Sequence, residues 1–223
     1  MPQPKIKAVC FDMDGLLFNT EELYDEMGIE MLRRRGKEID HELVRRMMGL
    51  QARLALEMFI EHYGLKNTPE ELMREGNEFF DRVLPTRLAP MPGAVELLNS
   101  LTQDGSRPLA LTTSSDKASV ERIMAIIDFR HHFDFWLTAE DIERSKPHPE
   151  IYTTAAARFN IEPNEMLVFE DSENGCKSGV AAGANVVAIP SKLTHDYTGS
   201  LFVADSLEDE RIAQLFATRN HHE

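Results

Sequence analysis

The sequence of 223 residues is poor in cysteine, in tryptophan and in positive charge. Its two cysteines, Cys10 and Cys176, lack the paired spacing of a zinc site or a redox dithiol, so we expect both to be free and packed. Lys and Arg number 24 against 38 Asp and Glu, and the net charge of −14 would repel the phosphate backbone of a nucleic acid. The composition therefore argues against a disulfide scaffold and against a polynucleotide partner.

Long apolar runs are also missing. With 42% hydrophobic and 28% charged residues, the composition is that of a soluble globular protein, and no stretch is long enough to cross a bilayer. Asp12 interrupts the first apolar run, at 8–11, far short of the length of a signal-peptide core. We expect a cytoplasmic protein that does not bind membranes and is a monomer or a weak dimer.

Two kinds of segment follow each other along the chain. Helical spacing and end signals predict helices without intervening strands at 21–35, 41–48, 52–63 and 70–84. From 91 onward helices alternate with short apolar strands, which we expect at 109–112, 133–137, 166–169, 185–189 and 201–203. Such alternation is typical of a parallel sheet covered by helices on both faces. We predict a doubly wound α/β core at 1–16 and 91–223, with an inserted α-helical cap domain at 17–90.

The first apolar run ends in two carboxylates, Asp12 and Asp14, followed by Gly15. Alternate residues of an extended chain share a face, so the two acids would be held at one opening beyond the strand. Like charges this close need a cation or a shared proton between them. An Asx turn that caps the next helix is the alternative explanation.

Hydroxyl groups and a lysine occupy two later positions of the same kind. Thr113 and Ser114 follow the strand at 109–112, where hydroxyls and free backbone N–H groups suit a phosphate, although an ordinary helix cap explains them equally well. Lys146 precedes Pro147, which stiffens the chain. A lysine held there can neutralise an anionic nucleophile and a phosphoryl oxygen together. An exposed surface lysine is the alternative.

A second pair of acids, Glu170 and Asp171, ends the strand at 166–169. Carboxylate oxygens of this sort suit Mg²⁺, which keeps several waters and uses few protein ligands. Together with Asp12 and Asp14, these residues bring four negative charges, whereas one Mg²⁺ and Lys146 bring three positive charges. Protonation of Asp14 would balance the site, which could then admit a phosphate dianion.

Taken in order, four segments closely resemble the four motifs of the haloacid dehalogenase superfamily: Asp12-x-Asp14-Gly15, Thr113-Ser114, Lys146-Pro147 and Glu170-Asp171. The resemblance extends over the whole chain, since the helical insertion is similar to the small α-helical cap of this superfamily. The run Phe-Asp-Met-Asp-Gly-Leu-Leu at 11–17 resembles the branch of β-phosphoglucomutases and sugar phosphatases.

The resemblance implies a two-step phosphoryl transfer through an aspartyl phosphate. Asp12 would be the nucleophile, while Asp14 would protonate the leaving oxygen and then deprotonate the attacking group. Thr113 and the backbone of Ser114 would hold phosphoryl oxygens, and Lys146 would pair with Asp12 and the phosphoryl group. The implied ligands of Mg²⁺ are Asp12, the backbone carbonyl of Asp14, Asp171 and, directly or through water, Glu170.

Within the superfamily, an acid at the position of Asp14 favours phosphate esters as substrates. The mutases of this branch have a histidine where this chain has Tyr24, and an arginine where it has Ala52, with Arg53 one residue later. We therefore predict an Mg²⁺-dependent phosphatase of a small phosphorylated metabolite, a sugar phosphate. The alternatives are a β-phosphoglucomutase-type phosphomutase and a non-catalytic sugar-phosphate-binding protein. Asp14 argues against the latter, because binding alone needs no general acid.

Overall fold

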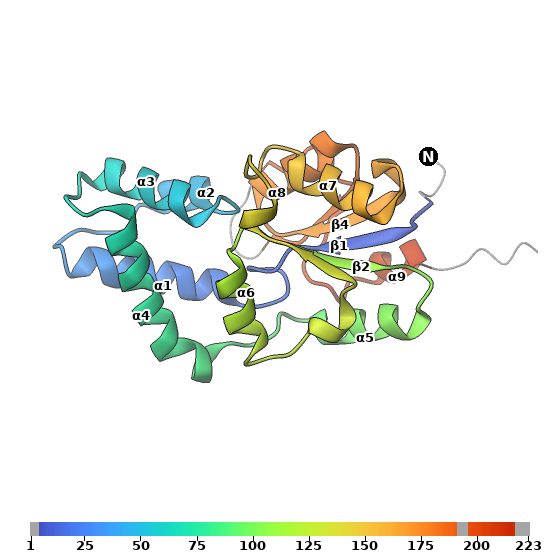
Figure 1. Cartoon of the computed structure of the whole chain (residues 1–223), viewed down its shortest axis with the longest axis horizontal. Coiled ribbons are helices and arrows are strands. Elements are labelled where there is room, and N and C mark those ends of the chain that lie inside the picture. Colours follow the sequence, from blue (N-terminus) through green and yellow to red (C-terminus); the bar gives the residue numbers. More distant parts are fainter. Residues whose placement is uncertain (1–4, 191–195, 217–223) are drawn as a thin grey trace, which may run out of the picture.

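The computed structural model describes residues 5–190 and 196–216 (Figure 1). Six strands form one sheet in the order β3-β2-β1-β4-β5-β6, and all neighbouring strands are parallel. The strands are β1 (Ala8–Phe11), β2 (Leu109–Thr112), β3 (Phe135–Leu137), β4 (Met166–Glu170), β5 (Asn185–Ala188) and β6 (Phe202–Val203). The doubly wound α/β fold that the alternation of strands and helices predicts is confirmed.

The three central strands, β2, β1 and β4, are buried along their whole length. Burial on both faces explains why they read as continuous apolar runs rather than as alternating ones. In register, Phe11 of β1 lies beside Leu111 on one side and Phe169 on the other. The residues that follow these strands therefore meet at one edge. The strand order reverses at β1, which is the usual position of a ligand in an open α/β sheet.

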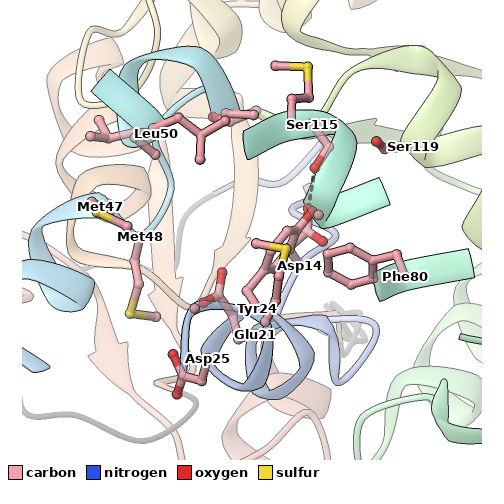
Figure 2. A pocket seen from close by; sticks show the side chains of 18 of the residues that line it. Asp14, Glu21, Tyr24, Asp25, Met47, Met48, Leu50, Phe80, Ser115 and Ser119 are labelled. Carbon is pink, nitrogen blue, oxygen red and sulfur yellow. Dashed lines mark hydrogen bonds between the residues drawn. The ribbon is translucent and has the colours of Figure 1, made fainter. Parts of the chain in front are cut away.

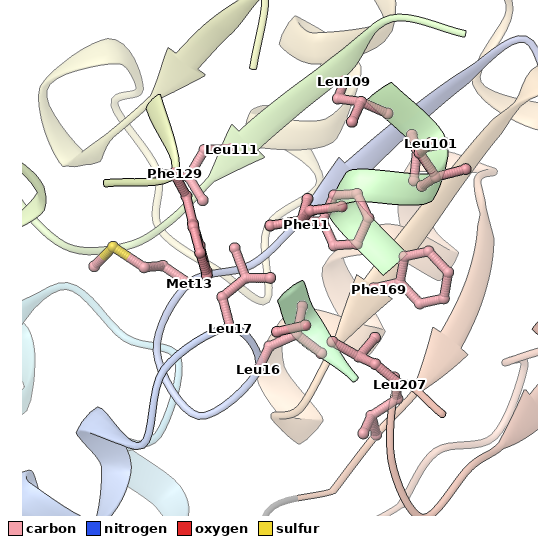
Figure 3. Close-up of a cluster of buried hydrophobic side chains, with 14 of the residues drawn as sticks. Phe11, Met13, Leu16, Leu17, Leu101, Leu109, Leu111, Phe129, Phe169 and Leu207 are labelled. Atoms are coloured by element: carbon pink, nitrogen blue, oxygen red, sulfur yellow. The ribbon is translucent and has the colours of Figure 1, made fainter. Parts of the chain in front are cut away.

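Helices cover both faces of the sheet (Figure 1). Packed on one face are α5 (Ala94–Asp104), α6 (Lys117–Met124) and α9 (Glu210–Phe216). On the other face are α7 (Glu150–Phe159) and α8 (Glu173–Ala182). The first face carries the larger apolar cluster, in which the rings of Phe11 and Phe169 stack with their centroids 5.0 Å apart (Figure 3). Short 3-10 helices lie at Arg130–His132, Ala139–Asp141 and Pro163–Glu165.

The cap consists of four helices that extend beyond one end of the sheet (Figure 1): α1 (Thr20–Arg33), α2 (His41–Met47), α3 (Ala52–Tyr63) and α4 (Pro69–Arg87). The two connections to the core pair with each other. The N–H of Asn19 donates to the carbonyl of Ala89 at 3.1 Å, and that of Met91 donates to Leu17 at 2.9 Å. Because the connections pair there, we propose 17–90 as the limits of the cap.

A few elements end elsewhere than the sequence predicts. α4 continues to Arg87 through Pro85, because a proline in the last turn of a helix removes only one backbone hydrogen bond. α6 ends at Met124, and beyond it the chain turns more tightly, with the N–H of Ile126 donating to the carbonyl of Ile123 at 3.0 Å. α9 is missing from the sequence-based expectation, since seven residues show too little periodicity to be recognised. Among the helices of the described residues, none is both long and apolar enough to span a bilayer.

Candidate active site

Lys146 joins two carboxylates that come from neighbouring strands. Asp12 directly follows β1 and Glu170 is the last residue of β4. The ammonium group of Lys146 donates to Oδ1 of Asp12 at 2.6 Å and to Oε1 of Glu170 at 2.5 Å. It also donates to the carbonyl oxygen of Thr112, the last residue of β2, at 3.1 Å. The lysine that the sequence places in a loop is therefore fully buried among the ends of three strands.

The three buried charges depend on one another. Burial alone would lower the pKa of Lys146, but the adjacent carboxylates of Asp12 and Glu170 outweigh it and raise the pKa. The lysine is therefore charged at neutral pH. Removing one member of such a group leaves an uncompensated buried charge, which is costly. The geometry thus fixes the Asp12 carboxylate in one position.

A second set of contacts fixes Glu170. The hydroxyl of Tyr152 in α7 donates to Oε1 at 2.6 Å, and that of Ser172 donates to Oε2 at 3.2 Å. Gly175 in α8 packs directly against this carboxylate, because a Cβ there would lie 2.0 Å from it. Neither Tyr152 nor Ser172 is among the site residues that the sequence motifs predict. Tyr152 lies inside a helix with ordinary apolar spacing, so no local pattern marks it.

Asp171 completes a cluster with Asp12 and Glu170. One carboxylate oxygen of each residue lies within 4.8 Å of the other two, and all three residues are buried. Oδ2 of Asp171 is buried without a hydrogen-bond partner among the residues that the structure describes. Gly15, with φ at +75°, faces this atom, and a Cβ there would lie 2.2 Å from it. The lack of a side chain at Gly15 therefore leaves room for this carboxylate oxygen.

Negative charge exceeds positive charge in this cluster. Burial, with repulsion from Glu170 and Asp14, raises the pKa of Asp12 to about 8 despite the attraction of Lys146. Burial and neighbouring carboxylates likewise raise the pKa of Asp171 well above its usual range. A divalent cation would stabilise all three carboxylates in their ionised forms, and buried carboxylate oxygens are ligands that Mg²⁺ accepts. The residues present therefore fit a magnesium ion.

The carboxylate of Asp14 lies outside this cluster and is held by hydroxyl groups. Thr20 donates to its Oδ1 at 2.7 Å, while Ser115 and Thr113 donate to its Oδ2 at 2.7 and 3.3 Å. Burial raises the pKa of Asp14, and the three hydroxyls offset part of that rise. Such a carboxyl can hold a proton and give it up again, as a general acid and base must. Thr20 and Ser115 are not among the residues that the motifs pick out.

Ser114 has a different partner from Thr113. Its hydroxyl donates to the carbonyl oxygen of Gly49, in the α2–α3 connection of the cap, at 2.7 Å. Gly49 has φ at +75°, and a Cβ there would lie 2.5 Å from the hydroxyl of Ser172. The side-chain amide of Asn174 donates to the carbonyl oxygen of Met48, the residue before Gly49, at 2.8 Å. The side chain of Ser114 therefore links the turn after β2 to the cap, while its predicted backbone contact to phosphate stays a prediction.

A cavity of about 210 Å³ lies between these groups and the cap. Its wall includes five of the predicted site residues: Asp12, Asp14, Thr113, Ser114 and Asp171. Tyr24 of α1 and Phe80 of α4 lie beside Asp14, with their ring centroids 4.7 Å apart in an edge-to-face arrangement (Figure 2). On the cap side the wall is mainly apolar. Lys146 and Glu170 are buried behind it.

The two positions that distinguish mutases in the sequence analysis are both on the cavity wall. Tyr24 and Ala52 line it, so the mutase-type histidine and arginine are replaced by a phenol and a methyl group. Arg53 does not substitute for the missing arginine, because it lies on the exposed face of the cap in ion pairs with Glu57 and Glu70. The cap therefore lacks both mutase-type side chains at the site.

Comparisons with known proteins identify relatives of this chain. The family model described as haloacid dehalogenase-like hydrolase matches residues 9–189. The phosphorylated carbohydrates phosphatase of Thermotoga maritima is 32% identical over 178 residues, which cover 80% of this chain and 82% of that protein.

Two solved structures share the fold. CbbY from Rhodobacter sphaeroides in complex with phosphate has a TM-score of 0.81 at 24% identity, covering 95% of this chain and 100% of that chain. β-Phosphoglucomutase from Clostridium difficile has a TM-score of 0.79 at 20% identity, covering 95% and 97% of the two chains. At these identities the two structures show a likeness of fold alone.

Proposed function

This chain belongs to the haloacid dehalogenase-like hydrolase family and is a phosphatase, and we propose that it hydrolyses a small phosphorylated carbohydrate with Mg²⁺ through an aspartyl phosphate formed on Asp12. One observation carries the proposal. Asp12, Lys146 and Asp171 meet at one edge of the sheet, with Asp14 beside them in the same cavity wall. The name of the Thermotoga relative supports the substrate class.

Asp12 is the nucleophile in this proposal. Its Oδ1 is held by Lys146 at 2.6 Å, which leaves Oδ2 to attack phosphorus in line with the leaving oxygen. A new Asp12–phosphorus bond forms as the ester bond breaks. Mg²⁺ bound by the carboxylates of Asp12, Glu170 and Asp171, with the backbone carbonyl of Asp14, would offset the negative charge of the phosphoryl oxygens.

Thr113 and Ser114 supply the remaining contacts to the phosphoryl group. Both residues follow β2 at the edge where Asp12 lies, and both line the cavity. Backbone N–H groups at such a turn are suited to phosphoryl oxygens. We assign these contacts to the Thr113 side chain and the Ser114 backbone N–H.

Asp14 acts as the general acid and then as the general base. In the first step its protonated carboxyl gives a proton to the leaving oxygen, which departs as an alcohol. In the second step the Asp14 carboxylate takes a proton from water as that water attacks the phosphoryl group on Asp12, and phosphate is released. The hydroxyls of Thr20 and Ser115 hold the carboxyl in place during both steps.

Water, rather than a second sugar hydroxyl, is the acceptor in this proposal. A mutase must hold a sugar in position to receive the phosphoryl group from Asp12. On the cavity wall, Tyr24 and Ala52 stand in place of the mutase-type histidine and arginine, so the site holds a sugar in that position less firmly. Hydroxyl contacts to Asp14 also weigh against a purely binding function, which has no use for a positioned general acid.

The proposal is tested by incubating the protein with Mg²⁺ and a panel of sugar phosphates while both free phosphate and isomerised sugar are measured. We expect free phosphate only, lost when Mg²⁺ is chelated. Asp12→Asn should lower turnover by at least ~10³-fold, since the nucleophile is removed, whereas the same change at the exposed Asp128 should not matter. Undiminished turnover by Asp12→Asn refutes the assignment of Asp12 as the nucleophile. Isomerised sugar indicates the mutase, and binding without turnover indicates a sensor.

A further inference from the structure

The cap side of the cavity is lined by thioethers. Five methionines from the cap helices and the α2–α3 connection line it: Met27, Met31, Met47, Met48 and Met73 (Figure 2 labels two of them). Methionine side chains are unbranched and polarizable, so they adapt to ligands of irregular shape. They offer no strong hydrogen bond, however. A bare sugar, which carries hydroxyls around its ring, would lose hydrogen bonds to water there without replacing them.

Two glycines inside cap helices line this space. Gly28 in α1 and Gly76 in α4 both line the cavity, and neither has a positive φ. Glycine is less favourable than alanine in a helix interior, so backbone geometry does not explain their presence. A Cβ at position 28 would lie 3.4 Å from Cδ1 of Ile39, and one at position 76 would lie 2.8 Å from the Met27 sulfur. A methyl group at position 28 would therefore lie beside Ile39, which also lines the cavity, whereas one at position 76 would displace the Met27 thioether from the wall.

Charge on the wall excludes a second phosphate. Among the lining residues that the structure describes, six are acidic: Asp12, Asp14, Glu21, Asp25, Asp116 and Asp171. Arg122 is the one Lys or Arg in that described set, and its guanidinium group is already bonded to Asn77 at 3.1 Å and paired with Asp81 at 3.5 Å. A second dianion in the cap would therefore meet negative charge without a free cationic partner.

The size of the cavity leaves room for an apolar ring. An apolar cavity of about 150 Å³ is large enough to bind benzene, and this cavity measures about 210 Å³. The carboxyl of Asp14 and the hydroxyls of Ser115 and Ser119 face it from the core side (Figure 2). Phe59 and Leu72 of the cap also line it. Apolar side chains are therefore available on the cap side of the cavity.

We infer that the preferred substrate is a sugar monophosphate whose sugar bears an uncharged apolar substituent, which enters the methionine-lined part of the cavity, and that sugar bisphosphates are excluded. This inference rests on the proposed phosphatase function. Three features of the wall carry it: its thioethers, the two helix-interior glycines and the lack of a free cation among the described lining residues.

Three compounds that differ only at the anomeric carbon test the inference: glucose 6-phosphate, phenyl glucoside 6-phosphate and glucose 1,6-bisphosphate. With Mg²⁺, kcat/KM for phosphate release from the phenyl glucoside should be at least ~10-fold higher than from glucose 6-phosphate, which corresponds to about 1.4 kcal/mol. The bisphosphate should be at least ~10-fold poorer than glucose 6-phosphate. Equal values for the phenyl and unsubstituted compounds, or efficient turnover of the bisphosphate, overturn the inference.

A cavity-filling variant sharpens the test. Gly28→Ala places a methyl group at ordinary contact distance from Ile39, so the variant should fold. It should lower the ratio of kcat/KM for the phenyl glucoside to that for glucose 6-phosphate by at least ~3-fold. Asn99→Ala, on the exposed side of α5 and outside the lining residues, raises helix propensity in the same way and should leave the ratio unchanged. An unchanged ratio in Gly28→Ala contradicts the inference.

Binding to Asp12→Asn separates this inference from the proposed function. Calorimetric titration of that variant with the three compounds reports the preference of the cavity without turnover. Preference for the phenyl glucoside without phosphate release by the wild-type protein sustains the inference and refutes the phosphatase. Phosphate release without any preference for the phenyl glucoside, in turnover and in binding, refutes the inference and sustains the phosphatase.

Discussion

The core and the cap meet at one cavity but are built on opposite principles. On the core side charged side chains have fixed partners at the ends of β1, β2 and β4, as Lys146 has with Asp12 and Glu170. On the cap side the wall includes flexible thioethers and two helical glycines, Gly28 and Gly76. We therefore propose that charge and distance on the core side set the chemistry, whereas the volume and polarity of the cap side set which leaving group can enter.

Replacing Lys146, on the core side, should have the largest effect on stability and activity. Lys146→Met leaves Asp12 and Glu170 buried without their shared ammonium group, so we expect about 3–5 kcal/mol lower stability and no measurable phosphatase activity. Urea denaturation and phosphate release measure the two effects. Lys177→Met makes the same change at a half-exposed lysine that pairs with Glu173, and should cost less than about 0.5 kcal/mol. Similar losses in both variants would contradict the assigned importance of the buried pair.

Tyr152 tests whether the contacts behind the cluster matter. Tyr152→Phe removes the hydroxyl that donates to Glu170 at 2.6 Å, which should cost about 1.5–3 kcal/mol of stability. Affinity for Mg²⁺, measured by calorimetry, should fall by about 10-fold or more, because such partners orient metal ligands. Tyr63→Phe removes a hydroxyl contact within the cap, at Asp40, and serves as the control. An unaltered Mg²⁺ affinity in Tyr152→Phe would remove Tyr152 from the site.

A substitution that fills space in the cap should raise stability, whereas the substitutions in the core lower it. Gly28→Ala should raise stability by about 1 kcal/mol, because alanine is the better helix former and its methyl group meets no clash. Thermal or urea denaturation measures this gain. A loss of stability instead would show that the glycine is needed for packing rather than for open space.

The contact between the two regions should give the smallest effect. Ser114→Ala removes the hydrogen bond to the carbonyl of Gly49 but keeps the backbone N–H of Ser114. We expect KM to rise about threefold with kcat nearly unchanged, since the cap loop is held less firmly. A fall in kcat with unchanged KM would instead place the hydroxyl at the reacting phosphoryl group.

The positions of the core site residues can be predicted from the sequence because these residues come at the ends of apolar strands. Asp12, Thr113 and Asp171 each follow such a strand, and parallel strands bring their carboxyl ends to one edge. Tyr152 cannot be predicted in this way, since it reaches Glu170 from within the first turn of α7 and does not follow a strand. Thr20 is equally hidden, because a hydroxyl at the start of a helix reads as an ordinary cap.

The cap is harder to predict than the core for a physical reason. Its four helices follow from periodicity and end signals, such as the capping box of Thr68 and Glu71 at the start of α4. The cavity between them does not, because it depends on how helices distant in sequence pack. Gly28 and Gly76 gain their significance only when α1 and α4 are placed side by side.

The central assignment is Asp12 as the nucleophile that receives the phosphoryl group from the substrate. Chemical trapping tests this assignment most directly. Asp14→Asn should slow hydrolysis of the intermediate, so that acid quenching during turnover followed by borohydride reduction converts the phosphorylated aspartate to homoserine. Peptide fragmentation in a mass spectrometer then distinguishes position 12 from other carboxylates. Our account predicts homoserine at position 12 only. Reduction at Glu170 or Asp171, or phosphate release by Asp12→Asn at the rate of the unchanged protein, would contradict it.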